Sequence, residues 1–236
     1  MADFSEDHRK YIGDPKKIIC GLEKFLIEKM VEENPDKYFR PNQFQNEYNF
    51  WAHYHNTANE IWKDTDGKIT HFVAGLGTSG TIMGVSKRLK ELNPDIKIIG
   101  VEAYPHTNIM GLKNYDVQYV PEIFDPKLLT KKIKIKDEDA FEMTRLLTLR
   151  EGIFSGISSG AAMHVALEIS KELEDGLIVV LLPDGGEKYI STRCFDPLAC
   201  LQCVNKCNLP TCLTSDYSTT VAGWFEEERQ NKNEKK

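Results

Sequence analysis

Three short stretches of glycine and hydroxyl residues carry the side chains and backbone freedom that could bind a phosphorylated ligand. The first, residues 75–81, reads Gly-Leu-Gly-Thr-Ser-Gly-Thr and stands between an apolar run and a helical pattern. Its glycines let the backbone turn tightly and approach a ligand, and the start of the following helix attracts an anion. Because Thr78, Ser79 and Thr81 place three hydroxyl groups within four residues, we expect a cup for a phosphate monoester here.

Two other interpretations of this first stretch stay open. It also forms the pattern G-x-G-x-x-G, and Glu102 stands near the place where a dinucleotide-binding fold puts its ribose acceptor, at a somewhat longer spacing than usual. A tight turn without any ligand explains the pattern equally well. The nicotinamide-dependent oxidoreductase that this alternative predicts explains the first stretch only.

Two further glycine-containing stretches stand later in the chain. Residues 156–162 read Gly-Ile-Ser-Ser-Gly-Ala-Ala, and Ser158 or Ser159 can cap the helix that follows. Residues 182–189 read Leu-Pro-Asp-Gly-Gly-Glu-Lys-Tyr and follow an apolar run, at the edge where open α/β sheets bind ligands. Taken alone, each of these two stretches is more often structural than functional.

The elements around these stretches predict a parallel sheet covered by helices. A strand, a glycine turn, a helix and a second strand follow one another from residue 69 to residue 101, which is the order of a βαβ unit. We expect an amphipathic helix over residues 14–33, loop and irregular structure that leads into a short helix over 38–62, and a long ligand-serving loop over 104–136. In all, we expect buried strands over residues 69–74, 96–101 and 177–182. We expect helices over residues 79–92, 137–150 and 159–173.

Taken together and in this order, the three stretches resemble the cysteine synthase and cystathionine β-synthase family of pyridoxal-phosphate enzymes. The resemblance covers about residues 31–193, and residues 34–39, 41–44, 111–113 and 121–125 add to it. It implies the α/β, three-layer parallel sheet of the fold-type II pyridoxal-phosphate enzymes, with the N-terminal portion incomplete. It also implies three parts: a remnant of the smaller domain and a linker (1–69), a cofactor-phosphate-binding α/β domain (70–193), and a Cys-rich extension with a charged tail (194–236).

The resemblance assigns roles to residues of all three parts of the site. It implies that the first stretch holds the phosphate of pyridoxal phosphate and that the loop around Gly111 lies near the substrate entrance. The end of the third predicted strand would approach the pyridine nitrogen. The cofactor-binding residues expected on this basis are Gly77, Thr78, Ser79, Gly80, Thr81, Asp184 and Gly185.

The activity that the resemblance implies is a β-replacement, in which sulfide displaces the leaving group of an activated serine (O-acetyl- or O-phosphoserine) and gives L-cysteine. The expected partners are a small-molecule amino acid and a second copy in a homodimer. Family members carry a Schiff-base lysine and a substrate-carboxylate loop ahead of this region, and no matching motif stands before Gly75. We therefore expect a chain that is inactive alone and is completed by a complementary N-terminal chain, or else a non-catalytic binding or regulatory member; the catalytic residues stay unknown.

A cluster of cysteines near the C-terminus is the remaining candidate site. Its spacing, C-x2-C-x3-C-x4-C, could supply four thiolates to a zinc ion or an iron-sulfur cluster, although it matches no standard signature closely. Free thiols, a redox pair or a sulfur-carrying thiolate are equally open alternatives. The four predicted ligands are Cys200, Cys203, Cys207 and Cys212, whereas no metal is assigned to His53, His55 or His71.

Composition excludes several other classes of protein. The chain has 236 residues, 41% of them hydrophobic, and a net charge of -6 with its basic residues spread along the sequence, so we expect no nucleic-acid partner. Its longest apolar runs are far shorter than the roughly 20 residues of a membrane-spanning helix. Since the N-terminus is acidic and mixed rather than basic and then apolar, we expect a cytoplasmic protein.

Overall fold

The computed structural model describes residues 26–105, 107 and 109–195 of the chain. The four predicted metal ligands, Cys200, Cys203, Cys207 and Cys212, lie outside the described residues. Within the described part, no helix is long and apolar enough to cross a bilayer. The described residues do not test the predicted division of the chain into three parts (1–69, 70–193 and 194–236), which stays a prediction.

Four parallel strands in the order β3-β2-β1-β4 form the centre of the molecule. Central strand β1 pairs with β2 on one side and β4 on the other, so that Val73 lies between Ile99 and Val180. The α/β parallel sheet predicted from the sequence is thereby confirmed. The strands are β1 (His71–Gly75), β2 (Lys97–Ala103), β3 (Lys131–Ile135) and β4 (Ile178–Val180).

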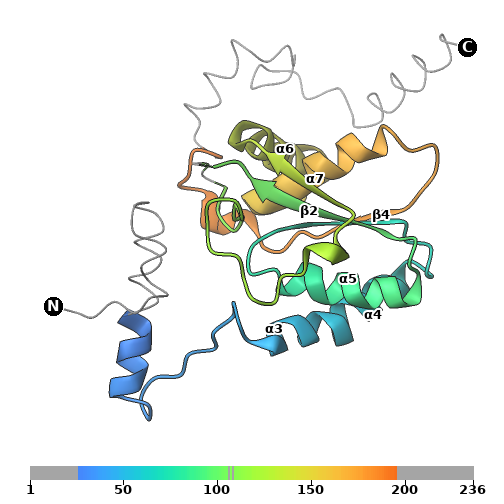
Figure 1. Ribbon diagram of the computed structural model, residues 1–236. Helices are drawn as coiled ribbons and strands as arrows, with labels where there is room; N and C mark the ends of the chain where they lie inside the picture. Colours follow the sequence, from blue (N-terminus) through green and yellow to red (C-terminus); the bar gives the residue numbers. More distant parts are fainter. Residues whose placement is uncertain (1–25, 106, 108, 196–236) are drawn as a thin grey trace, which may run out of the picture.

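Helices cover both faces of this sheet and give the molecule three layers (Figure 1). Along β1, Phe72 and Ala74 are buried against α5 (Gly80–Leu92) and α4 (Ala58–Asp64). Val73 points to the opposite face, where it is buried with residues of α6 (Asp137–Glu151) and α7 (Ile157–Ser170). Because successive side chains of a strand alternate between faces, the sheet separates two hydrophobic cores.

The segment over residues 38–62, which the sequence predicts as irregular structure leading into a short helix, is more helical than predicted. Helix α3 (Glu47–Ala52) continues through a π-helical turn, η1 (His53–Thr57), into α4, so residues 47–64 are helical without a break. A π-turn adds a residue to the usual helical turn and shifts the apolar period, which hides the helix in the sequence. The aromatic rings of Phe50, Trp51 and Tyr54 pack on one another, and Lys87 of α5 lies over two of them.

Strand β3 was not predicted at all, because it lies inside the segment read as a long loop. Its sequence, Lys-Lys-Ile-Lys-Ile, is short and rich in lysine, as is common for a strand at the edge of a sheet. Short 3-10 turns cover Pro126–Leu128 before it and Gly186–Tyr189 near the end of the described chain. A further helix runs through residues 26–33 and lies apart from the three layers (Figure 1).

Candidate functional site

The three glycine- and hydroxyl-rich stretches meet at the carboxyl edge of the sheet. Strand β1 leads directly into residues 76–79, and the neighbouring strand β4 leads into residues 181–185. The backbone N–H of Leu181 donates to the carbonyl of Val73 at 3.0 Å, which keeps the two strand ends together. Helix α7, which carries the second stretch, packs against both strands and begins at Ile157.

The loop before α5 presents backbone N–H groups and hydroxyls at a helix start. Ser79 adopts the left-handed conformation, with φ of 65°, and its hydroxyl donates to the carbonyl of Thr78 at 2.7 Å. Among the described residues, no side chain caps the first turn of α5, a helix of 13 residues. The first N–H groups of a helix need partners from outside it, so an anion is favoured at this position.

Gly111, the predicted substrate-loop residue, lies between the loop before α5 and the start of α7. A Cβ atom on Gly77 would stand only 2.8 Å from the Gly111 carbonyl oxygen. Gly111 itself has φ of +90°, and a Cβ atom there would contact the Ser158 hydroxyl at 3.5 Å. Two further bonds hold this approach: the Tyr115 hydroxyl donates to the carbonyl of Gly77 at 3.0 Å, and the Lys113 N–H donates to the carbonyl of Leu76 at 2.8 Å.

Asp184 follows β4, and only one of its two carboxylate oxygens has a hydrogen-bond partner among the described residues. Its Oδ2 accepts from the Tyr189 hydroxyl at 2.6 Å, and the Lys188 Nζ lies 3.6 Å from the same oxygen. Its Oδ1 is buried and has no hydrogen-bond partner among the described residues. Burial, together with the bond to Asp184, raises the pKa of Tyr189 to about 12, so this hydroxyl stays a donor at neutral pH.

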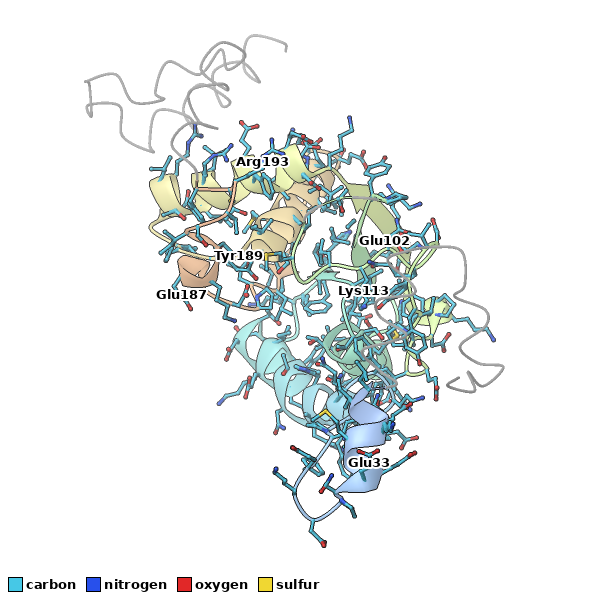
Figure 2. The ribbon with its side chains drawn as sticks, turned by 90° about the vertical axis from the view of Figure 1, so that its left-hand side faces the viewer. Glu33, Glu102, Lys113, Glu187, Tyr189 and Arg193 are labelled. Atoms are coloured by element: carbon cyan, nitrogen blue, oxygen red, sulfur yellow. The ribbon has the colours of Figure 1, made fainter. Side chains whose placement is uncertain are left out.

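The backbone around Asp184 is held by the chain segment that precedes α7. The Gly156 N–H donates to the Asp184 carbonyl at 2.9 Å, and Gly185 pairs with Ser155 in an antiparallel bridge. A Cβ atom on Gly156 would collide with the Asp184 carboxylate, so the position of the third stretch requires a glycine at residue 156 of the second. Figure 2 shows Tyr189 and Glu187 together in the turn that follows.

Glu102, the acceptor in the dinucleotide alternative, is fully buried and engaged by the protein itself. Its Oε1 accepts from the Tyr115 N–H at 2.6 Å and from the Lys132 Nζ at 3.1 Å. Figure 2 shows Glu102 close to Lys113, whose carbonyl accepts from the Ala103 N–H at 3.3 Å. These contacts give the carboxylate a structural role, which is to fasten the loop around Gly111 to β2 and β3.

Two residues to which the sequence analysis gave no role also reach the site. Asn49 of α3 donates from Nδ2 to the Thr78 hydroxyl oxygen at 3.0 Å. His53 of η1 lies with Nε2 3.1 Å from the Thr81 hydroxyl oxygen. Both residues lie in the helical segment of residues 47–57, where the sequence predicts mainly irregular structure. Only a prediction of this helix could have placed them beside the loop of residues 77–81. The complete arrangement can hold an anion at the start of α5 and a protonated nitrogen at Asp184.

Comparisons with known proteins agree on one family. The family model described as pyridoxal-phosphate dependent enzyme matches residues 22–184. A cysteine synthase of Aquifex aeolicus is 43% identical in an alignment of 208 residues that covers 82% of this chain and 63% of that protein. A cysteine synthase B of Pseudomonas aeruginosa is 40% identical over 172 residues, which are 73% of this chain and 57% of that protein.

The similarity extends to solved structures. The crystal structure of O-acetyl serine sulfhydrylase isoform 3 from Entamoeba histolytica superposes with a TM-score of 0.68 at 34% identity, over 76% of this chain and 56% of that one. The chain thus spans between 56% and 63% of the length of these three proteins.

Proposed function

Because the chain belongs to the family of pyridoxal-phosphate dependent enzymes, we propose that it forms the cofactor-binding part of a cysteine synthase-like enzyme. The reaction would be the β-replacement of an activated serine, O-acetyl- or O-phosphoserine, by sulfide to give L-cysteine. When bound, pyridoxal phosphate supplies the electron sink for such a reaction, and the protein supplies position and electrostatics.

The observation that carries this proposal is the meeting of three distant stretches at one edge of the sheet. Residues 77–81 offer an uncapped helix start and hydroxyl groups, which suit a phosphate dianion. Asp184 Oδ1 is a buried acceptor without a partner among the described residues, which suits a protonated ring nitrogen. A flat ligand with a phosphate and a pyridine nitrogen would bind to both the start of α5 and Asp184. The residues present therefore fit the cofactor.

Within this site we assign separate tasks to the chain's own residues. Residues 77–81 bind the phosphate, Gly111 and its neighbours border the substrate entrance, and Asp184 with Gly185 approaches the pyridine nitrogen. Tyr189 donates to Asp184 Oδ2, which leaves Oδ1 as the acceptor for a hydrogen bond from the protonated ring nitrogen. A carboxylate at that place keeps the ring protonated and strengthens its electron withdrawal.

We propose further that this chain has no turnover of its own. A nucleophilic lysine must be poised beside the cofactor carbonyl to form an imine, and no lysine before Gly75 stands in a matching motif. A complementary N-terminal chain would supply it, and a homodimer is the assembly we expect. The cysteine tail would add a zinc ion or an iron-sulfur cluster, or carry sulfur on a thiolate.

The first experiment follows the absorption spectrum of the purified chain during titration with pyridoxal phosphate, then borohydride reduction and mass spectrometry. We expect saturable binding, a free-aldehyde spectrum and no lysine adduct. The variant Asp184→Ala should weaken binding and shift the spectrum, whereas Asp175→Ala, at an exposed position, should change neither. Absence of binding by the unaltered chain would contradict the cofactor site.

A second measurement tests the claim about turnover. The chain is mixed with pyridoxal phosphate, O-acetylserine or O-phosphoserine, and sulfide, and cysteine is quantified over time. We expect no cysteine above the rate without protein. Cysteine formed at enzymatic rates, or a lysine trapped by borohydride, would show that a lysine of this chain has taken the missing role.

A further inference from the structure

The π-helical turn His53–Thr57 lies directly against the first part of α5. A Cβ atom on Gly84 would collide with the Phe50 carbonyl and would lie 2.9 Å from the Tyr54 nitrogen and 3.0 Å from the His53 Cβ. The absence of a side chain at residue 84 therefore lets the two helical segments approach each other. This approach places side chains of α3 and η1 beside the loop of residues 77–81.

Asn49 determines which way the Thr78 hydroxyl can point. Its Nδ2 donates both to the Gln43 carbonyl at 2.7 Å and to the Thr78 Oγ1 at 3.0 Å. A carbonyl can only accept, so the bond to Gln43 identifies this atom as the amide nitrogen. Because the Thr78 oxygen accepts from Asn49, its own hydrogen is free to be donated elsewhere.

His53 lies within hydrogen-bond distance of the Thr81 hydroxyl, as Asn49 does of the Thr78 hydroxyl. Its Nδ1 lies 3.0 Å from the Thr57 Oγ1 and its Nε2 lies 3.1 Å from the Thr81 Oγ1, so each ring nitrogen faces one hydroxyl. Burial lowers the pKa of His53, which keeps the ring neutral at pH 7 and able to exist as either tautomer.

The two tautomers have opposite effects on an anion at residues 77–81. With the proton on Nε2, Thr57 donates to Nδ1, and Nε2–H donates to Thr81, whose hydroxyl hydrogen is then available to the anion. With the proton on Nδ1, the Thr81 hydroxyl must donate to His53, and only oxygen lone pairs face the anion. An anion is stabilised by the first arrangement and repelled by the second.

We propose that Asn49 and His53 are positioning residues that orient the Thr78 and Thr81 hydroxyls as hydrogen-bond donors to a phosphate group. His53 would act as the Nε2–H tautomer, held by the Thr57 hydroxyl. The inference rests on the proposed function, because it concerns the same phosphate site. It adds that Asn49 and His53, which would not touch the ligand, determine the direction in which the Thr78 and Thr81 hydroxyls donate.

The test measures equilibrium binding of pyridoxal phosphate, inorganic phosphate and pyridoxal to the whole chain. His53→Leu removes the donor, and we expect it to weaken binding of both phosphate-bearing ligands about tenfold, as for one lost bond to a charged group. Pyridoxal, which has no phosphate, should bind unchanged. His53→Gln should restore most of the affinity because its Nε2 can donate to Thr81, whereas His55→Leu, at an exposed neighbour, should have no effect.

Two further measurements separate orientation of a hydroxyl from a general structural role. In the background Thr81→Val, His53→Leu should cause no additional loss, because the hydroxyl that it orients is gone. Nitrogen-15 NMR of the chain should show the His53 proton on Nε2. A proton on Nδ1, or a His53→Leu chain that binds as tightly as the unaltered one, would overturn this inference while the phosphate site stands. If the unaltered chain binds neither phosphate-bearing ligand, the proposed function fails, and this inference fails with it.

Discussion

At the scale of single residues, the site contains polar side chains that use only one of their hydrogen-bonding positions within the described part of the protein. Tyr189 occupies one oxygen of Asp184 and leaves the other buried without a partner among the described residues. Asn49 donates to the oxygen of Thr78 and leaves its hydrogen free. An unpaired buried polar group costs about 1–3 kcal/mol, which a ligand that completed the bonding at Asp184 would offset.

Cys194 allows a prediction about alkaline stability. Its thiol is fully buried, with Sγ 3.8 Å from the Phe141 carbonyl oxygen, and burial raises its pKa to about 11 from an ordinary value of 9.0. The folded state therefore holds this proton more tightly than the unfolded chain. The resulting stabilisation is complete below pH 9 and is lost as the pH rises toward 11.

Urea unfolding at several pH values checks this prediction. The free energy of unfolding should fall between pH 9 and 11, and the variant Cys194→Ala should show a shallower fall over the same range. Tyr189, whose raised pKa lies near 12, adds a fall at higher pH in both proteins. An identical slope in the two proteins would mean that the Cys194 thiol ionises in the folded state as it does in the unfolded chain.

At the scale of elements, the contact between η1 and α5 places Asn49 and His53 beside the loop of residues 77–81. Alanine in place of glycine normally stabilises a helix by roughly 0.5–1 kcal/mol. At residue 84 the added methyl group would meet the backbone of Phe50 and Tyr54 instead. We expect Gly84→Ala to lower the free energy of unfolding by about 2 kcal/mol, since overpacking against backbone outweighs helix propensity.

Denaturant unfolding of Gly84→Ala and of Lys87→Ala gives a matched comparison on the same helix. Lys87 is exposed and lies over the rings of Phe50 and Trp51, so its replacement should cost less than about 1 kcal/mol. A stabilising effect of Gly84→Ala would show that α5 and η1 do not lie in contact at this point.

At the scale of the whole molecule, one sheet divides the interior into two cores. Ile98 and Ile99 are adjacent in β2, yet Ile98 is buried with the residues around α5, and Ile99 with those around α6 and α7. Each change of isoleucine to valine should cost about 0.5–1.5 kcal/mol. Because the two side chains have no common neighbours across the sheet, the double variant should cost the sum of the two within about 0.5 kcal/mol.

The measurement is a double-mutant cycle from denaturant unfolding of Ile98→Val, Ile99→Val and the chain with both changes. A coupling of 1 kcal/mol or more would contradict the separation of the two cores. Equal slopes of the unfolding curves in all four proteins serve as the check that each unfolds in the same two-state manner.

The local sequence determined the class of fold and the stretches that meet at the carboxyl edge. Largely apolar, β-branched runs such as residues 96–101 predict buried parallel strands, and glycines with hydroxyl groups at 77–81 predict a turn into a helix. These signals depend on neighbours within a few residues, so they can be read without the fold. The same signals did not predict β3, which is short and rich in lysine, or the full helical course of residues 47–64, whose π-turn interrupts the helical period.

Tertiary structure alone decided how the site is completed. The bonds Asn49 to Thr78 and His53 to Thr81 join residues 29 and 28 positions apart, and Tyr115 reaches Gly77 across 38 positions. No local propensity records such pairs, because they arise only when α3 and η1 pack on α5 and the loop of Gly111 lies over the end of β1. Residue types showed which groups could bind a phosphate, and packing set the direction in which those groups point.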